Sequence, residues 1–349
     1  MSNNSTTLFS GQVIYIGMDV HKRSWTVTEL YGGNVTRTNS ITPSLKRLAE
    51  RLHREYPGAE FKSVYEAGFC GFHLHRKLEE IGIHNIVINP ADVPTSWKER
   101  NGKNDAVDSR KLARELANNT LIPIYIPSEE NLRLRNLVRR ETQVVRNRTR
   151  CMNRIKAHLT LNGMTLKSWS GGNLRQQRAE ALNHGDITLC LLIDELLMQR
   201  QQHLETLRQE RLCVRSLGLE ELLKRLDSVP GIGFRTALML LAEIWDMKRF
   251  HTGDQLTSFV GLSPRLYGSG DSERMTGTGT RKHAALQSLL IEAAWRAIGI
   301  DVELRAKYCS LSAKKKPQVA IFAVARKLLM RIRAVWLLEK NYNLNRVEK

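Results

Sequence analysis

Residues 13–18 read VIYIGM, a short apolar run that predicts a buried β-strand. Two further strand-like segments follow at 25–31 and 34–41, and Gly32-Gly33 between them favours a hairpin. The folded part of the chain is therefore predicted to begin with three strands in a meander.

Helices and strands alternate after this meander. Helical periodicity recurs at 44–56, 71–81 and 105–117. Short apolar runs between these helices predict strands at 61–65 and 85–88. This order of elements indicates an α/β domain with a mixed, RNase H-like (RuvC-like) sheet, which we expect over residues 1–128.

The following segment, residues 129–225, contains no proline and almost no strand signal. Apolar residues recur at helical spacing in a narrow stripe with charged flanks, up to a break at Gly163 and Gly171-Gly172 and again over 187–215. This pattern predicts a helical or coiled-coil connector.

Residues 226–349 are predicted to form a mainly helical domain. The sequence SVPGIG at 228–233 is typical of a helix-hairpin-helix turn, in which backbone N–H groups near Gly231 and Gly233 can contact a phosphate. A Gly/Ser-rich stretch at 268–279 predicts a polar loop, and two helices are expected at 283–298 and 317–340.

The composition points to a polyanionic partner. Among 349 residues, 54 Lys and Arg stand against 35 Asp and Glu, a net charge of +19. A basic chain of this kind most often binds nucleic acid, although a merely well-solubilised protein is the alternative. An apolar content of 42% excludes a wholly disordered chain.

Other sequence features bear on the compartment. Five cysteines without a C-x-x-C pair argue against a disulfide scaffold or a zinc site and fit a reducing cytoplasm. No secretory signal and no apolar run of the ~18 residues that a membrane span needs is visible. We expect a cytoplasmic protein that is not associated with a membrane.

One helical stretch concentrates basic residues with few acids beside them, so nucleic-acid contact is favoured over a solvated face. Its basic residues are Arg133, Arg135, Arg139, Arg140, Arg146, Arg148, Arg150, Arg154 and Lys156.

Four carboxylates follow strands or open a helix. Asp19 comes directly after the first strand, Glu66 ends a later strand, and Asp105 and Asp108 share one face of a helix start. Strand ends in one sheet lie ~4.8 Å apart, so these oxygens can converge on Mg²⁺. The alternatives are a turn residue at Asp19, a helix cap at Asp105 and an ion pair at Asp108. His21 is either an aid to the metal site or a structural residue.

Several motifs resemble a known family. GMDVHK at 17–22, YEAG at 65–68 and KNDAVDS at 103–109 look like the acidic tetrad motifs of DEDD-type insertion-sequence transposases, also called bridge-RNA-guided recombinases. The resemblance extends to that family's second domain, through VPGIG at 229–233, FVGLSP at 259–264, Ser269-Gly270 and LLIEAA at 289–294.

The resemblance implies a function. It makes Asp19, Glu66, Asp105 and Asp108 ligands of Mg²⁺ and Ser269 the nucleophile that holds a DNA strand covalently. It also implies a structured guide RNA that pairs with donor and target DNA. The subunits would form dimers that assemble into a tetramer, with acids and serine of each active site from different chains.

The chain also departs from the family pattern. Gln287 stands where Arg is common, so Arg274, Arg281 and Lys282 are expected to take over phosphate contacts. Ser272 competes with Ser269 for the role of nucleophile. Two alternative functions stay open: a RuvC-like junction nuclease in which water attacks, and a non-catalytic nucleic-acid-binding scaffold.

Overall fold

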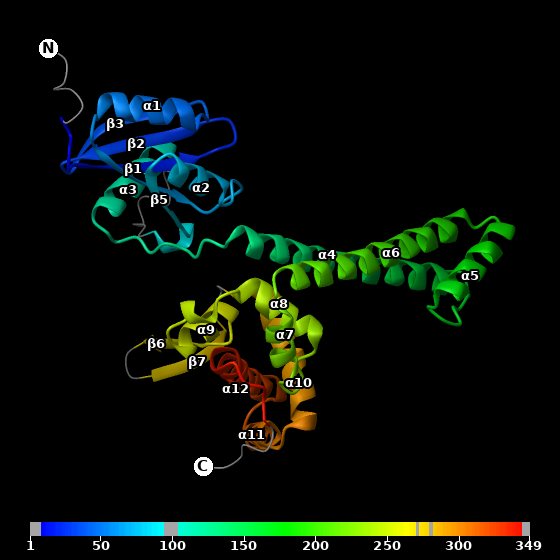
Figure 1. Cartoon of the computed structure of the whole chain (residues 1–349). Coiled ribbons are helices and arrows are strands. Elements are labelled where there is room, and N and C mark those ends of the chain that lie inside the picture. Colours follow the sequence, from blue (N-terminus) through cyan, green and yellow to red (C-terminus); the bar gives the residue numbers. More distant parts are fainter. Residues whose placement is uncertain (1–7, 94–103, 270–271, 279–281, 344–349) are drawn as a thin grey trace. The chain divides into compact units, whose positions relative to one another are not determined.

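A computed structural model describes residues 8–93, 104–269, 272–278 and 282–343. The chain divides into two compact units, residues 1–127 and 128–349, coloured from blue to cyan and from green to red in Figure 1.

The first unit is built on a five-stranded mixed sheet. Its strands are β1 (Val13–Val20), β2 (Trp25–Tyr31), β3 (Asn34–Ile41), β4 (Glu60–Glu66) and β5 (Ile83–Ile88). They lie in the order β3-β2-β1-β4-β5, with an antiparallel meander on one side of β1 and parallel β4 and β5 on the other. The predicted mixed sheet is confirmed.

Helices cover both faces of this sheet. Leu48 and Leu52 of α1 (Leu45–Glu55) and Leu74 and Leu78 of α2 (His73–Glu80) pack on one face with Ile14, Ile16 and Met18. The opposite face carries α3 (Asp105–Ala117), whose Leu112 packs on Val64 and Ile88. A 3₁₀ turn, Pro90–Asp92, follows β5.

The second unit begins with a long helical hairpin. α4 (Glu129–Leu161) and α6 (Ile187–Ser216) pack against one another in antiparallel fashion, and α5 (Gly171–Asn183) lies between them in sequence. The predicted break in the helix is present over residues 162–170. Gly171 and Gly172 lie just beyond it as the first residues of α5, because Ser170 caps that helix by accepting the backbone N–H of Asn173 at 3.2 Å.

The remaining helices form the largest core of this unit. They are α7 (Glu220–Asp227), α8 (Phe234–Ile244), α9 (Gly253–Val260), α10 (Ala284–Ile300), α11 (Val302–Ser312) and α12 (Pro317–Leu338), with a 3₁₀ turn at Met247–Arg249. Leu134 and Val138 of α4 are part of the same core. The connector and C-terminal segment, which the sequence divided at residue 225, thus share one compact unit.

The Gly/Ser-rich stretch is not simply a loop. β6 (Pro264–Ser269) and β7 (Ser272–Thr278) pair as an antiparallel hairpin, and Tyr267, Thr276 and Thr278 in these strands favour extended backbone. Within the described residues, none of the helices is both long enough and apolar enough to span a membrane.

Candidate functional site

The carboxyl ends of β1 and β4 place two of the predicted acids side by side. Met18 pairs with Tyr65 in the parallel ladder, so Asp19 and Glu66 are the next residues on neighbouring strands and share a face. Asp19 belongs to the strand and not to a turn, because it also pairs with Thr26 of β2.

Gly17 sets the position of α3 on this face. A Cβ at Gly17 would lie 2.0 Å from the carbonyl oxygen of Ser109 and 2.5 Å from the backbone nitrogen of Ala113. The helix therefore packs directly on the strand backbone, and the buried hydroxyls of Ser109 and Thr28 lie 2.8 Å apart beside it. This close contact places the first turn of α3 next to Asp19.

Asn104, and not Asp105, caps this helix. The Asn104 side chain accepts the backbone N–H of Ala106 at 3.0 Å, so Asp105 is the first helical residue and is not needed for capping. Asp105 and Asp108 both lie in the first turn, where the helix dipole stabilises negative charge.

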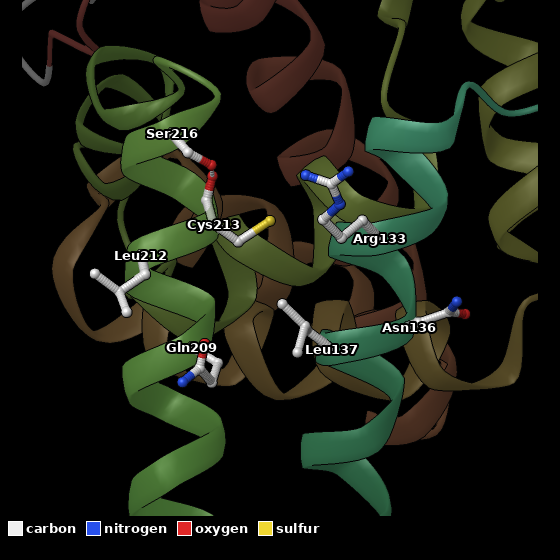
Figure 2. A pocket seen from close by; sticks show the side chains of 7 residues that line it. All are labelled: Arg133, Asn136, Leu137, Gln209, Leu212, Cys213 and Ser216. Atoms are coloured by element: carbon white, nitrogen blue, oxygen red, sulfur yellow. Dashed lines mark hydrogen bonds between the residues drawn. The ribbon is translucent and has the colours of Figure 1, made fainter.

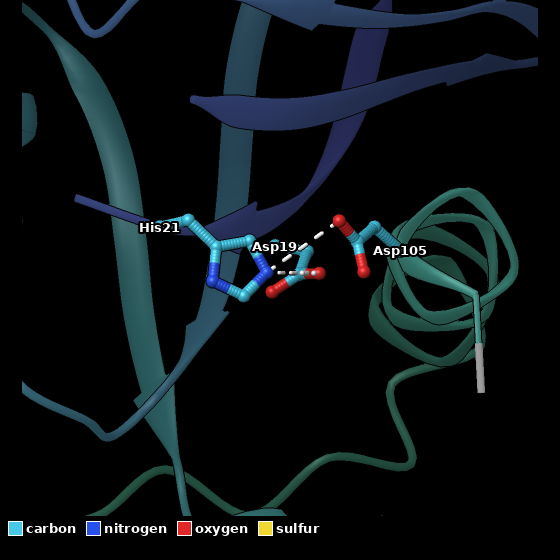
Figure 3. Close-up of side chains that lie close together, drawn as sticks. All are labelled: Asp19, His21 and Asp105. Carbon is cyan, nitrogen blue, oxygen red and sulfur yellow. Dashed lines mark ion pairs between the residues drawn. The ribbon is translucent and has the colours of Figure 1, made fainter. Parts of the chain in front are cut away.

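The structure brings Asp19, His21 and Asp105 together, as Figure 3 shows. The Nε2 atom of His21 lies 3.2 Å from one oxygen of Asp19 and 3.5 Å from one of Asp105. Burial raises the pKa of Asp19, the charges of Asp105 and Asp108 raise it further, and His21 opposes them.

The other two acids lie around this cluster. Asp108 is half-buried one turn further along α3 and close enough for its charge to act on Asp19. Glu66 is exposed at the end of β4 and lies outside the group of three. Of the four predicted acids, Asp19 and Asp105 therefore have carboxylate oxygens close enough to bind one ion, together with the imidazole of His21.

The donor set fits a divalent cation. One ligand atom from each of Asp19, His21 and Asp105 lies within 4.8 Å of the other two. Carboxylate oxygens suit Mg²⁺ and Mn²⁺, and a cation would offset the repulsion from Asp105 and Asp108, which adds to burial in raising the pKa of Asp19.

The predicted nucleophile lies in the second unit. Ser269 is the last residue of β6 and pairs with Ser272, the first residue of β7. Gly270 and Asp271 between them, and Arg281, lie outside the described residues. Arg274 pairs with Tyr267 in the same hairpin.

The root of this hairpin is held by buried contacts. Gly261 ends α9 with a φ of +87°, and a Cβ there would lie 2.3 Å from the Cβ of Lys282. The side-chain amide of Gln287 donates to the Gly261 carbonyl at 2.5 Å. Gln287, at the position where the family commonly has Arg, is thus buried in a structural contact.

Two family models match this chain. A model of DEDD-type IS110 transposases covers residues 16–163, and a model described as "Transposase IS116/IS110/IS902 family" covers residues 223–309. The chain belongs to the IS110/IS116 family of DEDD-type insertion-sequence transposases. It is a DNA transposase, and the DEDD domain implies an RNase H-like fold and a divalent metal.

Individual relatives of this transposase are distant. The Sinorhizobium fredii protein y4rJ is 26% identical over 93% of this chain and 91% of its own. The transposase for insertion sequence element IS1111A of Coxiella burnetii is 26% identical over 66% of this chain and 64% of its own. The transposase for IS1533 of Leptospira borgpetersenii is 24% identical over 81% and 85%.

The positive charge of the Arg-rich helix α4 of the transposase is partly neutralised by acidic side chains of other helices in the same unit. Glu243 of α8 is buried and accepts two hydrogen bonds from Arg139 at 2.7 and 2.8 Å, while Arg135 lies 3.4 Å away. Arg154 pairs with Glu195 of α6 at 3.3 Å. The expectation that few acids lie near this helix is therefore wrong, because α6 and α8 supply them across the fold.

Burial alone would raise the pKa of Glu243, but hydrogen bonds and charge from His283 and Arg139 lower it to about 2. His283 also caps α10, directly after the hairpin segment, by accepting the backbone N–H of Leu286 at 3.2 Å. Hydrogen bonds and ion pairs with the buried Glu243 carboxylate thus connect α4, α8 and the start of α10. A single acid, Glu243, within the otherwise apolar second half of α8 was the sequence signal that could have revealed this contact.

Four of the α4 arginines predicted to contact nucleic acid are exposed and form no ion pair with another described residue. They are Arg133, Arg140, Arg146 and Arg150. Arg133 lines a pocket of about 610 Å³ between α4 and α6, shown in Figure 2 with Gln209, Leu212 and Ser216 opposite. Lys156 is exposed and lies 5.9 Å from the centre of the Trp169 ring.

A second cavity contains residues that sequence analysis did not single out. Glu141 of α4 is buried and pairs with His203 at 2.9 Å and with Arg235. Arg148 contacts the same imidazole at 3.2 Å, and the cavity of about 590 Å³ beside them lies between α4, α6, α8 and α10. Glu141 thus pairs with the Arg235 cation of α8 and with an imidazole of α6, whose pKa is lowered by burial and by the charge of Arg148.

The turn at residues 228–233, predicted as helix-hairpin-helix, packs tightly on α10. Gly231 has a φ of +81°, and a Cβ there would lie 2.2 Å from the carbonyl oxygen of Ala293. Gly233 is the residue before α8. A phosphate contact from this turn stays a prediction, whereas the requirement for glycine at 231 follows from the packing.

Proposed function

We propose that this transposase cleaves, exchanges and rejoins DNA strands, with Asp19, Glu66, Asp105 and Asp108 around Mg²⁺ and with Ser269 as nucleophile. The observation that carries the proposal is the convergence of Asp19 and Asp105 at the end of β1. Bound Mg²⁺ supplies charge stabilisation at phosphorus and lowers the pKa of a coordinated hydroxyl.

The proposed chemistry conserves phosphodiester bonds. The Ser269 oxygen attacks phosphorus, an O–P bond forms, and the bond from phosphorus to a deoxyribose oxygen breaks. The serine proton passes to solvent, and the departing oxygen gains a proton. A hydroxyl of a second strand then attacks the same phosphorus and releases the serine, which completes strand exchange without an external energy source.

The proposal includes an element-encoded guide RNA that pairs with donor and target DNA. The motifs shared with bridge-RNA-guided recombinases support it, as do the net charge of +19 and the exposed arginines of α4. Arginine suits structured RNA because its planar group contacts phosphates and base edges at two points. Arg274, Arg281, Lys282, Gly231 and Gly233 are proposed as further contacts.

We also propose a homo-oligomer, a dimer that assembles into a tetramer. The acids lie in the first unit of the chain and Ser269 in the second, which is compatible with active sites composed from different subunits. Since the substrate is chromosomal DNA, the proposed place of action is the bacterial cytoplasm, at the nucleoid.

Trapping of a covalent protein–DNA adduct tests this function. The full-length protein with Mg²⁺, the element's RNA and a nicked suicide substrate is expected to yield an adduct that survives denaturing electrophoresis. Ser269→Ala should abolish the adduct, and the matched variant Ser272→Ala should retain it. Both variants should bind RNA as the wild type does in a gel-shift assay.

Other outcomes identify the alternatives. An adduct lost only in Ser272→Ala would make Ser272 the nucleophile. Cleavage by the wild type without any adduct would indicate a junction nuclease that uses water. Unchanged transposition after substitution of all four acids would leave only the scaffold function.

A further inference from the structure

His21 occupies a position that the acidic tetrad does not account for. It follows β1 directly and begins the turn to β2, in which its backbone N–H donates to the Ser24 carbonyl at 2.9 Å. Its imidazole is about half exposed (52%) and points toward Asp19 and Asp105 in Figure 3. A buried structural histidine would instead be enclosed by the core.

The distances fit three ligands of one ion. Neighbouring ligands of an octahedral Mg²⁺ with bonds of about 2.1 Å lie ~3.0 Å apart. The Nε2 atom of His21 lies 3.2 Å from Asp19 and 3.5 Å from Asp105, and all three ligand atoms lie within 4.8 Å of one another, so side-chain rotations would bring them onto one ion. The turn places the imidazole over the same sheet end that carries the carboxylates.

Nitrogen in the donor set changes which metals bind well. Mg²⁺ prefers oxygen ligands and keeps several waters, whereas imidazole binds first-row transition metals more strongly. An imidazole also adds a ligand without adding negative charge beside the two carboxylates.

We propose that His21 is a ligand of the divalent ion beside Asp19 and Asp105, and that this mixed centre binds Mn²⁺ more tightly than Mg²⁺. The inference rests on the proposed metal centre and goes beyond its four acids. The competing explanation is that the Nε2–H group of His21 only donates hydrogen bonds to the two carboxylates.

Pulsed electron paramagnetic resonance of Mn²⁺ bound to the full-length protein distinguishes these explanations. Directly bound imidazole gives a ¹⁴N coupling, which should be replaced by a ¹⁵N coupling in protein labelled with ¹⁵N-histidine. His21→Gln should remove the coupling and weaken Mn²⁺ binding by about 10-fold or more, with a smaller loss for Mg²⁺. The measurement on labelled wild type does not depend on the variant being folded.

His84→Gln is the matched control. His84 is an exposed histidine of the same unit that lies 3.5 Å from one carboxylate, Glu79. Its substitution should leave both the nitrogen coupling and the Mn²⁺ affinity unchanged. Mn²⁺ that binds in an Asp105-dependent way without nitrogen coupling would overturn the role of His21 and leave the acidic centre intact. Absence of any Asp105-dependent Mn²⁺ binding would overturn the proposed centre itself.

Discussion

The backbone of Gly17 on β1 packs against the carbonyl of Ser109 on α3, with no room for a side chain between them. Asp19 lies two residues further along the strand, and Asp105 lies one helical turn before Ser109. This contact between strand and helix therefore sets the separation of the two carboxylates.

Gly17→Ala is expected to displace α3 and to destabilise the first unit by about 3 kcal/mol or more, since the new Cβ would meet backbone atoms that cannot rotate away. Thermal unfolding with and without Mn²⁺ measures both stability and metal binding. Gly68→Ala, beside Glu66, is the control, because its nearest neighbour lies at 3.8 Å. Equal stability of the two variants would contradict the packing argument.

Glu60 begins strand β4 and Glu66 ends it, which allows a matched comparison. Glu66→Gln should lower Mg²⁺-dependent DNA cleavage on the order of 10²-fold, because a charge near the reacting phosphate is lost. Glu60→Gln, at the amino end of β4, should leave the rate unchanged. Cleavage assays under single-turnover conditions decide this, and full activity of Glu66→Gln would remove Glu66 from the centre.

Glu243 should stabilise the second unit in a pH-dependent way. Its pKa of about 2 lies below the ordinary value of 4.5, so its stabilisation is present above pH 4.5 and is lost as the pH falls toward 2. Glu243→Gln should cost about 3 kcal/mol at pH 7 and flatten the urea-unfolding profile in that acid range. The exposed Glu221→Gln serves as control.

Glu210 should have the opposite pH dependence. Neither of its carboxylate oxygens has a hydrogen-bond partner among the described residues, and burial raises its pKa to about 7. The folded state then holds a proton that the unfolded state releases, so stability falls as the pH rises from 4.5 to 7. Glu210→Gln should remove this fall and raise stability at pH 8 by about 3 kcal/mol. An unchanged unfolding profile would contradict the assignment.

Arg146 and Arg150 are exposed on α4 and lie outside its ion pairs. Each contact with a phosphate of duplex DNA contributes ~0.9 to the magnitude of the slope of log K against log[salt]. If both arginines make such a contact, the double variant Arg146→Gln/Arg150→Gln should lower this magnitude by about 1.8. Fluorescence anisotropy of labelled DNA across a salt series measures the slope. The control Arg208→Gln/Arg211→Gln removes equal charge from the exposed surface of α6 and should keep the wild-type slope.

The sequence by itself determined the order of strands and helices, since hydrophobic periodicity and turn residues act locally. The bounds 25–31, 34–41 and 105–117 agree with β2, β3 and α3. The sequence also identified Asp19 and Asp105, because acids at a strand end and a helix start occupy recognisable places. The β6–β7 pairing was missed because glycine and serine dominate its local signal.

Only the tertiary structure decided which charges meet. Glu243 neutralises Arg139 from 104 residues away, and His21 comes within 3.5 Å of Asp105 on another element. Such contacts depend on how helices and strands pack and not on spacing along the chain. The close approach that Gly17 permits is the physical reason that two distant acids become one site.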